Sequence, residues 1–499
     1  MNISTEPEHN SYLALLGAYE RDNFGDILFL KVCMKLLEPW PVVPLSLVSR
    51  NMRTEGADTV ISASAWFDCC QEVFLPKALI VAGGEVLNCP ISAALSFDID
   101  QTRKQSFSDT DKTYKKRVGD LLSWRAGDLA YVPDLNKLLD ANKHPIHVAL
   151  NSVGGSSLEP GTSSLIAALK KTIEQAKYTS VRDAVTHKLL NGNGSEQTSI
   201  DLNPDIVSAL RVCCAHEVET AFILSSSLNP WLKEPYLLVQ GSDNYIRKNG
   251  LQRVGEEIAA TARALNLSVV LQPAGIATGH DSFAMLDQLG QRTQEYAGRD
   301  LRIHTQYDRN VWTQVGVIAN AACFVGTSLH GRIVATAYAR PRVALENEKV
   351  KIYASTWEDF DLQPFDVPIE KLQAAVKKAM SVAATRLIAH ANNQADRALS
   401  GFAQLRHRLN LAEFSGSIEK INGQIQFFTE LALLRESDML RKAVLDLAYE
   451  LSQEHATKQM VQSKLSRILE APSWRLTKPV RAIDWLFSKA KKSTTNNGP

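Results

Sequence analysis

The sequence predicts an α/β protein with two consecutive Rossmann-like domains and a helical extension. Runs that are apolar on both faces alternate with helical stretches from Tyr12 to Asp205, and the alternation restarts near residue 236 and continues to about residue 345. Strands without a polar face belong in parallel sheets that helices cover on both sides. Two such units of similar size are expected to face each other across a cleft.

The chain of 499 residues is too long for a single core. We place an amino-terminal Rossmann-like domain at 1–220, a second Rossmann-like domain at 221–383, a helical or coiled-coil extension at 384–470, and a basic, aromatic tail at 471–499. These four divisions follow changes in composition and in the spacing of apolar residues.

Composition and charge exclude several classes of protein. The 55 basic and 54 acidic residues give a net charge of +1, so we expect no nucleic-acid partner. The polar amino terminus and the lack of an apolar run of about 20 residues predict a cytoplasmic protein without a signal peptide or membrane span. Seven cysteines without a C-x-x-C pair indicate neither a disulfide framework nor a zinc site, and we expect no metal.

The strands of the first domain are predicted at five apolar runs. These are YLALLGAY, VVPLSLV, KALIVAGG, PIHVALNSVGG and YTSVRD, in chain order. The second domain contributes YLLVQGS, SVVLQPAG, CFVGTS and RVAL, with helices such as Leu251–Leu265 between them. An open parallel sheet places its ligand at the carboxyl ends of its strands, so the residues after these runs are the candidates for a site.

The segment CFVGTSLHGRIVATAYARPRVAL, Cys323–Leu345, contains the most informative of these strand ends. We expect an inner strand, then a turn in which Ser328 caps the next helix. The first amides of that helix, including those of Leu329 and His330, lack intrahelical partners, and the helix dipole favours an anion there. A histidine that only hydrogen-bonds its own loop is the alternative interpretation.

Other strand ends carry polar or glycine residues that are individually weak signals. They are Asn23 and Asp26 in GAYERDNFGDILFL, Gly83 and Gly84 in KALIVAGGEVL, Arg182 in YTSVRD, Asp205 in LNPD, His280 and Asp281 in ATGHDS, and Lys349 in ENEKVKIY. Each fragment alone is more often structural.

In order, the fragments DNFGD, IVAGGE, NSVGGS, SVRD, NPD, VGTSLHGRIVATAYARPRVAL and EKVKIY resemble the polysaccharide pyruvyl transferase family. The resemblance runs from about Leu13 to about Trp357, and the histidine segment is its specific part. It implies a GT-B-like pair of Rossmann domains. It also implies transfer of the enolpyruvyl unit of phosphoenolpyruvate to two hydroxyls of a sugar, forming a cyclic ketal.

The implied chemistry assigns roles to these residues. His330 is the expected acid or base, since an imidazole exchanges protons near neutral pH. Phosphoenolpyruvate carries a phosphate and a carboxylate, so Arg182, Lys349 and the helix start at Ser328 and Leu329 are the expected donor contacts, with Gly83 and Gly84 allowing close approach. No cofactor is expected besides this co-substrate.

One position departs from the family pattern. Many members read R-L-H-G, with an arginine that grips the donor, and this chain has Ser328 there. Arg332 is a candidate replacement, but two helical steps put it roughly 200° around the helix from His330, so we expect it to face elsewhere.

The extension carries apolar residues in steps of three and four from Ile418 to Ile468, with a phase break between Ala432 and Leu440. This spacing predicts a coiled-coil-like seam, and both self-association and a helical hairpin packed on its own domain satisfy it. The tail that follows has six basic residues against Asp484, interleaved with Trp474, Trp485 and Phe487. Its SWRLTKPVR stretch resembles the tails of bacterial glycosyltransferases, and it suits either an anionic membrane surface or solvent.

Three functions follow from these patterns. The first is a phosphoenolpyruvate-dependent pyruvyl transferase that acts on a lipid-linked or nucleotide-linked saccharide of an envelope or exopolysaccharide, in the cytoplasm or at the inner face of the membrane. The second is a glycosyltransferase of the same fold that uses a nucleotide sugar. The third is a non-catalytic scaffold of a polysaccharide synthesis complex, in which Ser328 marks a degenerate site.

Overall fold

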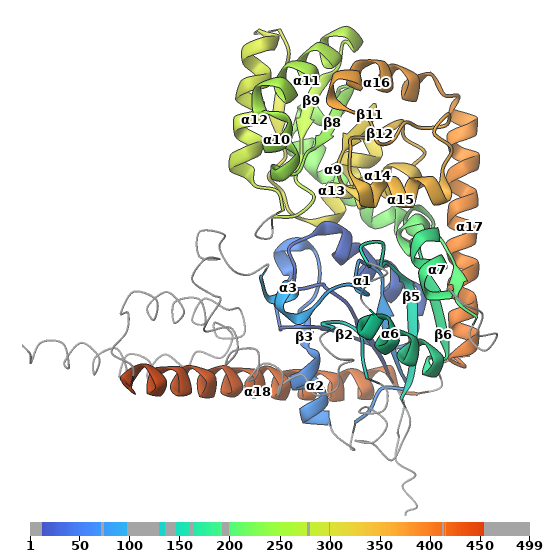
Figure 1. Ribbon diagram of the computed structural model, residues 1–499, viewed down its shortest axis with the longest axis vertical. Coiled ribbons are helices and arrows are strands. Elements are labelled where there is room, and N and C mark those ends of the chain that lie inside the picture. The colour runs from blue at the N-terminus through green and yellow to red at the C-terminus, as the bar shows by residue number, and fades with distance from the viewer. Residues whose placement is uncertain are drawn as a thin grey trace, which may run out of the picture.

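The computed structural model contains two α/β domains stacked one above the other, with one long helix running along both (Figure 1). The structure describes residues 12–70, 74–96, 129–134, 146–158, 163–191, 199–276, 280–298, 300–411, 414 and 416–453. All statements below concern these residues.

The first domain is built on a seven-stranded parallel sheet of order β3-β2-β1-β4-β5-β6-β7. Its strands are β1 (Leu13–Leu16), β2 (Val42–Ser46), β3 (Ile61–Ser62), β4 (Ala78–Ala82), β5 (His147–Val153), β6 (Tyr178–Val181) and β7 (Asp201–Leu202). Its helices include α1 (Phe24–Leu37), α2 (Ala63–Cys70), α3 (Ile91–Ser96), α6 (Ser163–Gln175) and α7 (Ala184–Asn191).

The second domain repeats the plan with a five-stranded parallel sheet of order β10-β9-β8-β11-β12. Its strands are β8 (Tyr236–Gln240), β9 (Ser268–Leu271), β10 (Ile303–Thr305), β11 (Cys323–Gly326) and β12 (Arg342–Ala344). Its helices are α10 (Asp243–Asn249), α11 (Leu251–Leu265), α12 (Phe283–Ala297), α13 (Val311–Asn320), α14 (Leu329–Ala337), α15 (Glu348–Trp357) and α16 (Leu372–Ser381).

A short helical segment joins the domains. It contains η3 (Ile206–Ala209), α8 (Leu210–Cys213), α9 (Ala215–Leu228) and η4 (Pro230–Lys233). In each sheet the strand order reverses beside the first strand, between β1 and β4 and between β8 and β11. Open α/β sheets bind ligands at the carboxyl ends of strands flanking such a reversal. Both the α1 turn and the histidine turn start at these ends.

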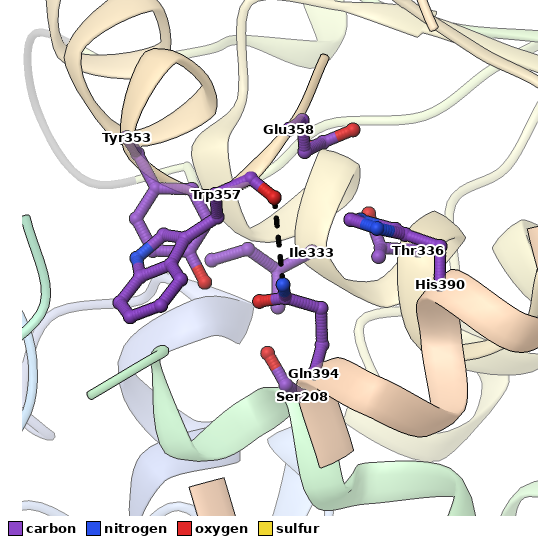
Figure 2. Close-up of a pocket in the computed structure, with 8 residues that line it drawn as sticks. All are labelled: Ser208, Ile333, Thr336, Tyr353, Trp357, Glu358, His390 and Gln394. Atoms are coloured by element: carbon purple, nitrogen blue, oxygen red, sulfur yellow. Dashed lines mark hydrogen bonds between the residues drawn. The ribbon is translucent and has the colours of Figure 1, made fainter. Parts of the chain in front are cut away.

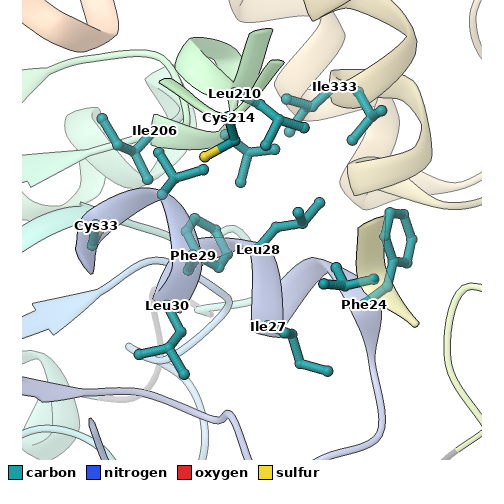
Figure 3. Close-up of a cluster of buried hydrophobic side chains, with 14 of the residues drawn as sticks. Phe24, Ile27, Leu28, Phe29, Leu30, Cys33, Ile206, Leu210, Cys214 and Ile333 are labelled. Atoms are coloured by element: carbon teal, nitrogen blue, oxygen red, sulfur yellow. The ribbon is translucent and has the colours of Figure 1, made fainter. Parts of the chain in front are cut away.

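Helix α1 forms the centre of the contact between domains. It is apolar around most of its circumference, as expected for a helix that is largely buried. Figure 3 shows Leu28 and Phe29 of α1 near Leu210 and Ile333, which come from α8 and α14. A single apolar cluster therefore continues from the first domain into the second.

Two long helices follow the second domain. Helix α17 (Ala384–Arg408) runs back from the second domain along the first and packs against η3 and α14 (Figure 1). Helix α18 (Ile418–Gln453) crosses the first domain, packs on α2 and extends beyond the domain. It is one continuous helix through the expected phase break. Its Ile421 and Ala432 are buried in the first domain, so this part of the apolar seam is covered within the chain.

The predicted fold class is confirmed. Each strand predicted from an apolar run is present, Cys323–Gly326 is an inner strand, and Leu251–Leu265 is helix α11. Prediction missed the short strands β3, β7 and β10. The tail 471–499 and the end of the predicted seam lie outside the described residues. None of the described helices is long and apolar enough to cross a membrane.

Candidate functional site

The histidine turn has the local structure that its sequence predicts. Strand β11 ends at Gly326, and Ser328 is the N-cap of α14, where its side chain accepts a hydrogen bond from the amide of Gly331 at 3.1 Å. The amides of Leu329 and His330 precede the first intrahelical bond. His330 is only 6% exposed. Its ring points away from its own domain toward the start of α1.

The ring of His330 lies against the backbone of α1. A Cβ atom on Gly25 would come within 1.9 Å of His330 Nδ1, so only a glycine admits the ring at this distance. Phe29, one turn further along α1, meets the ring edge-on with centroids 5.0 Å apart. A Cβ atom on Gly83 would in turn lie 2.0 Å from Phe29. The two glycine turns at the ends of β1 and β4 thus make room for the imidazole.

A buried carboxylate faces the other nitrogen of the imidazole. His330 Nε2 lies 3.7 Å from Oδ2 of Asp205, which is fully buried after β7. This separation is too long for a hydrogen bond, and Nε2 is buried without another partner among the described residues.

Asp205 belongs to a charge network. Arg182, at the end of β6, donates through Nη1 to Asp205 at 3.0 Å and through Nη2 to Glu85 at 3.1 Å. Glu85 follows Gly84 after β4, and Lys349 of α15 lies 3.9 Å from its Oε2. Glu85, Arg182 and Asp205 come from the first domain, and His330 and Lys349 come from the second. The network therefore spans the contact between domains.

These contacts shift the pKa of both carboxyl groups. Burial raises the pKa of Asp205, but His330, Arg182 and the amide of Val207 outweigh it, and the pKa lies below its ordinary value. Burial also opposes ionisation of Glu85, yet Lys349, Arg182 and hydrogen bonds from Ser156 and Ser157 lower its pKa to about 2. Both carboxyl groups are thus ionised near neutral pH.

A second group of charges lies at the start of α1. Asp26 is in its first turn, beside Gly84, where a Cβ atom would come within 3.4 Å of Asp26 Oδ1. Burial lowers the pKa of His280. The charge of Asp26 opposes this shift, and the charges of Arg21 and Lys349 add to it. Partial burial, followed by the charge of Arg182, likewise lowers the pKa of Lys349. Asp26, His280 and Lys349 are therefore electrostatically coupled to one another.

The loop after β9 attaches the second domain to the α1 turn. Asn23 caps α1 and forms a bridge with Gly275, while the amide of Phe24 donates to Ala274 and that of Ile276 donates to Asp22. Asp281 accepts a hydrogen bond from the amide of Ala274. Its burial raises its pKa to about 7, against hydrogen bonds from the loop amides. Asn23 and Asp281 therefore hold the loop that carries His280.

Most of the predicted site residues converge, but several have other roles than expected. The structure brings His330, Arg182, Asp205, Lys349, Gly83, Gly84, Asp26 and His280 to the facing edges of the two sheets. Arg182 is enclosed between two carboxylates instead of presenting a free guanidinium. The side chain of Leu329 is buried in the core, so only its backbone amide is available to a ligand.

Arg332 was a site candidate in the sequence, but it does not lie at the site. It is fully buried and donates to both carboxylate oxygens of Glu358, which Arg342 also contacts. As the helical geometry predicts, its side chain leaves α14 on a face remote from His330. Arg332 stabilises the second domain and does not replace the missing arginine at position 328.

A narrow pocket lies between α14, α15 and α17. Ser208, Ile333, Thr336, Tyr353, Trp357, Glu358, His390 and Gln394 line it (Figure 2). Its free space is too narrow for a water molecule, so it is a gap in packing between α14, α15 and α17. No group of residues able to hold a metal ion occurs in the described part of the chain.

Sequence reasoning passed over three residues that contact the site. Glu85 follows the glycine pair, and its only sequence signal was its place directly after a strand end. Tyr353 and Trp357 lie one and two turns after Lys349 on α15, where Tyr353 accepts a hydrogen bond from the amide of Asp205 and Trp357 donates one to the carbonyl of Arg182. In the sequence they read as ordinary apolar positions.

A family model described as polysaccharide pyruvyl transferase matches residues 23–349. The chain belongs to this family. The match starts at Asn23 of the α1 turn and ends at Lys349, so it includes every residue of the charge network between the domains. The resemblance inferred from the ordered fragments is confirmed.

The other comparisons add little to this assignment. No curated protein matches the chain. A UDP-GlcNAc 2-epimerase from Neisseria meningitidis is 8% identical with a TM-score of 0.44, over 79% of this chain and 98% of its own. A putative UDP-N-acetylglucosamine 2-epimerase from Listeria monocytogenes is 9% identical with a TM-score of 0.44, over 82% and 99%.

Proposed function

We propose that this chain transfers the enolpyruvyl unit of phosphoenolpyruvate to two hydroxyls of a sugar and releases inorganic phosphate. The observation that carries the proposal is the imidazole of His330, 3.7 Å from the ionised carboxylate of Asp205, at the meeting edges of the two sheets. Membership of the pyruvyl transferase family supports the reaction class. The donor is inferred from the chemistry of a pyruvate ketal.

The reaction balances with one acid–base group. A proton is added to the methylene carbon of the donor, and the first sugar hydroxyl forms a bond to the adjacent carbon and gives up its proton. The carbon–oxygen bond to phosphate then breaks, and the second hydroxyl forms the second bond and gives up its proton. One of the two released protons restores the acid, and the other leaves with phosphate.

His330 and Asp205 suit the proton transfers. The Nε2 atom of His330 faces the carboxylate of Asp205, so we assign to this ring the proton that the methylene carbon receives. A positioned acid or base typically contributes ~10² to ~10⁴ in rate. The edge contact with Phe29 and the close backbone of Gly25 fix the ring orientation.

The donor anions need cations or free amides. We assign them to Lys349, whose side chain is 39% exposed, and to the amides of Leu329 and His330 at the start of α14. The guanidinium of Arg182 is already paired twice, so its role is to hold Asp205 and Glu85 beside the donor. Ser328 contributes its helix cap and no charge, which makes the amides more important here than in members with an arginine.

The acceptor is proposed to be a lipid-linked or nucleotide-linked saccharide used for an envelope or exopolysaccharide. We expect it to be reached in the cytoplasm or at the inner face of the membrane. Attachment through the tail stays a prediction, because the tail lies outside the described residues. Self-association through the extension also stays a prediction, since the end of its apolar seam lies outside them as well.

The proposal is tested with purified full-length protein, phosphoenolpyruvate and a panel of lipid-linked and nucleotide-linked sugars. We expect acceptor-dependent release of phosphate that the substitution His330→Ala abolishes. Undiminished release in this variant would remove His330 from the mechanism.

A thermal-shift series separates the proposal from sugar-nucleotide chemistry. A ligand at 100 times its dissociation constant stabilises the folded state by about 2.7 kcal/mol. We expect phosphoenolpyruvate to raise the melting temperature and UDP or GDP sugars alone to leave it unchanged. Stabilisation only by the nucleotide sugars would overturn the assignment of the donor.

A further inference from the structure

Helix α15 of the second domain reaches across to the site residues of the first. Lys349, Tyr353, Thr356 and Trp357 are spaced so that they share one face of the helix. Each contacts a residue of the first domain, and three of these contacts are hydrogen bonds to its backbone. Figure 2 shows Tyr353 and Trp357 beside each other on this helix.

The hydrogen bonds involve backbone groups of the charge network. The hydroxyl of Tyr353 accepts from the amide of Asp205 at 3.2 Å. The indole of Trp357 donates to the carbonyl of Arg182 at 2.7 Å. Thr356 accepts from the amide of Ala184 at 3.1 Å, at the first turn of α7. Residues 182 and 205 thus receive a backbone contact from the domain that carries His330.

We propose that Tyr353 and Trp357 are positioning residues through which α15 holds Asp205 and Arg182 in place for His330, so that docking of this helix completes the site. Of the two tests below, only the kinetic one depends on the proposed function. Tyr353 is 4% exposed and Asp205 is fully buried, so solvent does not offer the Asp205 amide an equivalent partner.

The helix is itself held from behind. Gln394 of α17 donates to the carbonyl of Trp357 at 3.5 Å, and the guanidinium of Arg397 lies 5.4 Å from the Trp357 ring. Because α17 lies along both domains, α15 is fixed against the first domain from two sides. The Tyr353 hydroxyl therefore holds the backbone amide of Asp205 in a fixed position.

The direct test observes the His330 ring without any substrate. Ring resonances of isotope-labelled histidine, assigned with His330→Gln, are compared in Tyr353→Phe, Asp205→Asn and Tyr236→Phe. The last variant is the matched control, since Tyr236 loses a buried 2.6 Å hydrogen bond to the Val317 carbonyl within the second domain. We expect the His330 signals to shift in the first two variants and to stay in the control. Unshifted signals in Tyr353→Phe would overturn the proposal.

Kinetics supply a second readout. We expect Tyr353→Phe to lower kcat about tenfold, with little change in KM for phosphoenolpyruvate, since the loss acts on His330 through Asp205. In an Asp205→Asn background the same substitution is expected to have no further effect on kcat. Equal losses of kcat in both backgrounds would indicate a merely structural tyrosine. If the wild-type protein releases no phosphate, the proposed function fails while the resonance test still decides the positioning claim.

Discussion

A single missing side chain decides where the imidazole of this protein can lie. Gly25 is in the first turn of α1, and its Cα hydrogen faces Nδ1 of His330 across the contact between domains. The position of the His330 ring and the close contact between the domains therefore both depend on the absence of a side chain at Gly25. Gly83 acts in the same way for Phe29, which covers the ring.

The substitution Gly25→Ala is expected to displace the ring of His330 and to lower turnover by about 100-fold, since small misplacements of a reacting group have effects of this size. Thermal stability and activity are measured together. The control is Gly423→Ala in α18, where nothing lies within 4 Å of the added methyl group and alanine favours a helix. Full activity in Gly25→Ala would contradict the placement of His330.

Glu85 makes the folded state sensitive to acid. Its pKa of about 2 lies below its ordinary value of 4.5, so its contribution to stability is present above pH 4.5 and is lost as the pH falls through 2. We expect Glu85→Gln to lower the free energy of unfolding by at most about 3 kcal/mol at neutral pH. Denaturant unfolding at pH 6 and at pH 3 should show this difference shrinking in acid. A difference that does not change with pH would contradict the assigned ion pairs.

At the scale of elements, one helix start presents both the histidine and the unpaired amides. The N-cap Ser328 satisfies the amide of Gly331, which leaves the amides of Leu329 and His330 to face the site. In the proposed reaction, helix α14 supplies both the amides that bind the donor anions and the acid–base group. Helix α15, two elements later, adds the contacts to Asp205 and Arg182.

The substitution Ser328→Ala is expected to lower stability by about 1 kcal/mol, the usual effect of losing an N-cap. It should also weaken binding of phosphoenolpyruvate, because the first turn of α14 loses its fixed geometry. Ser328→Thr keeps a capping hydroxyl and is the conservative control. Equilibrium unfolding and ligand-dependent thermal shifts measure both effects. Unaltered stability in Ser328→Ala would contradict the capping role.

In the whole molecule, an ion cluster joins the two domains on another side of α1. Arg309, before α13, contacts Asp22 and Glu55 of the first domain, and Arg50 lies 3.4 Å from Asp22 and 3.6 Å from Glu55. Glu55 is buried. Together with the Asn23 bridge to Gly275, this cluster keeps the domains in contact.

Arg309→Ala removes the contribution of the second domain to this cluster. We expect a larger radius of gyration in X-ray scattering and a higher Kd for phosphoenolpyruvate, since separated domains no longer bring His330 to Asp205. Arg302→Ala is the matched control, because Arg302 pairs with Glu234 inside the second domain. The same radius in both variants would mean that Arg309 does not hold the domains together.

The fold and the centre of the site followed from the sequence for a physical reason. Apolar strands and the glycines at their ends are local signals, and parallel topology brings strand ends to one edge. His330, Asp205 and Lys349 could therefore be placed in one region. The double pairing of Arg182 could not, because Glu85 and Asp205 approach it only after three strands align. The direction of Arg332 could also be predicted, because residues two positions apart on a helix point to different sides of it.

In the proposed reaction, phosphoenolpyruvate gives up its phosphate by breaking the bond between carbon and the bridging oxygen. Phosphorus NMR of the product from donor labelled with heavy oxygen at the bridge tests it most directly. We predict that the isotope-shifted signal appears in inorganic phosphate, only with a sugar acceptor present and only when His330 is intact. Label that stays with pyruvate, or phosphate release that needs no acceptor, would contradict this reaction.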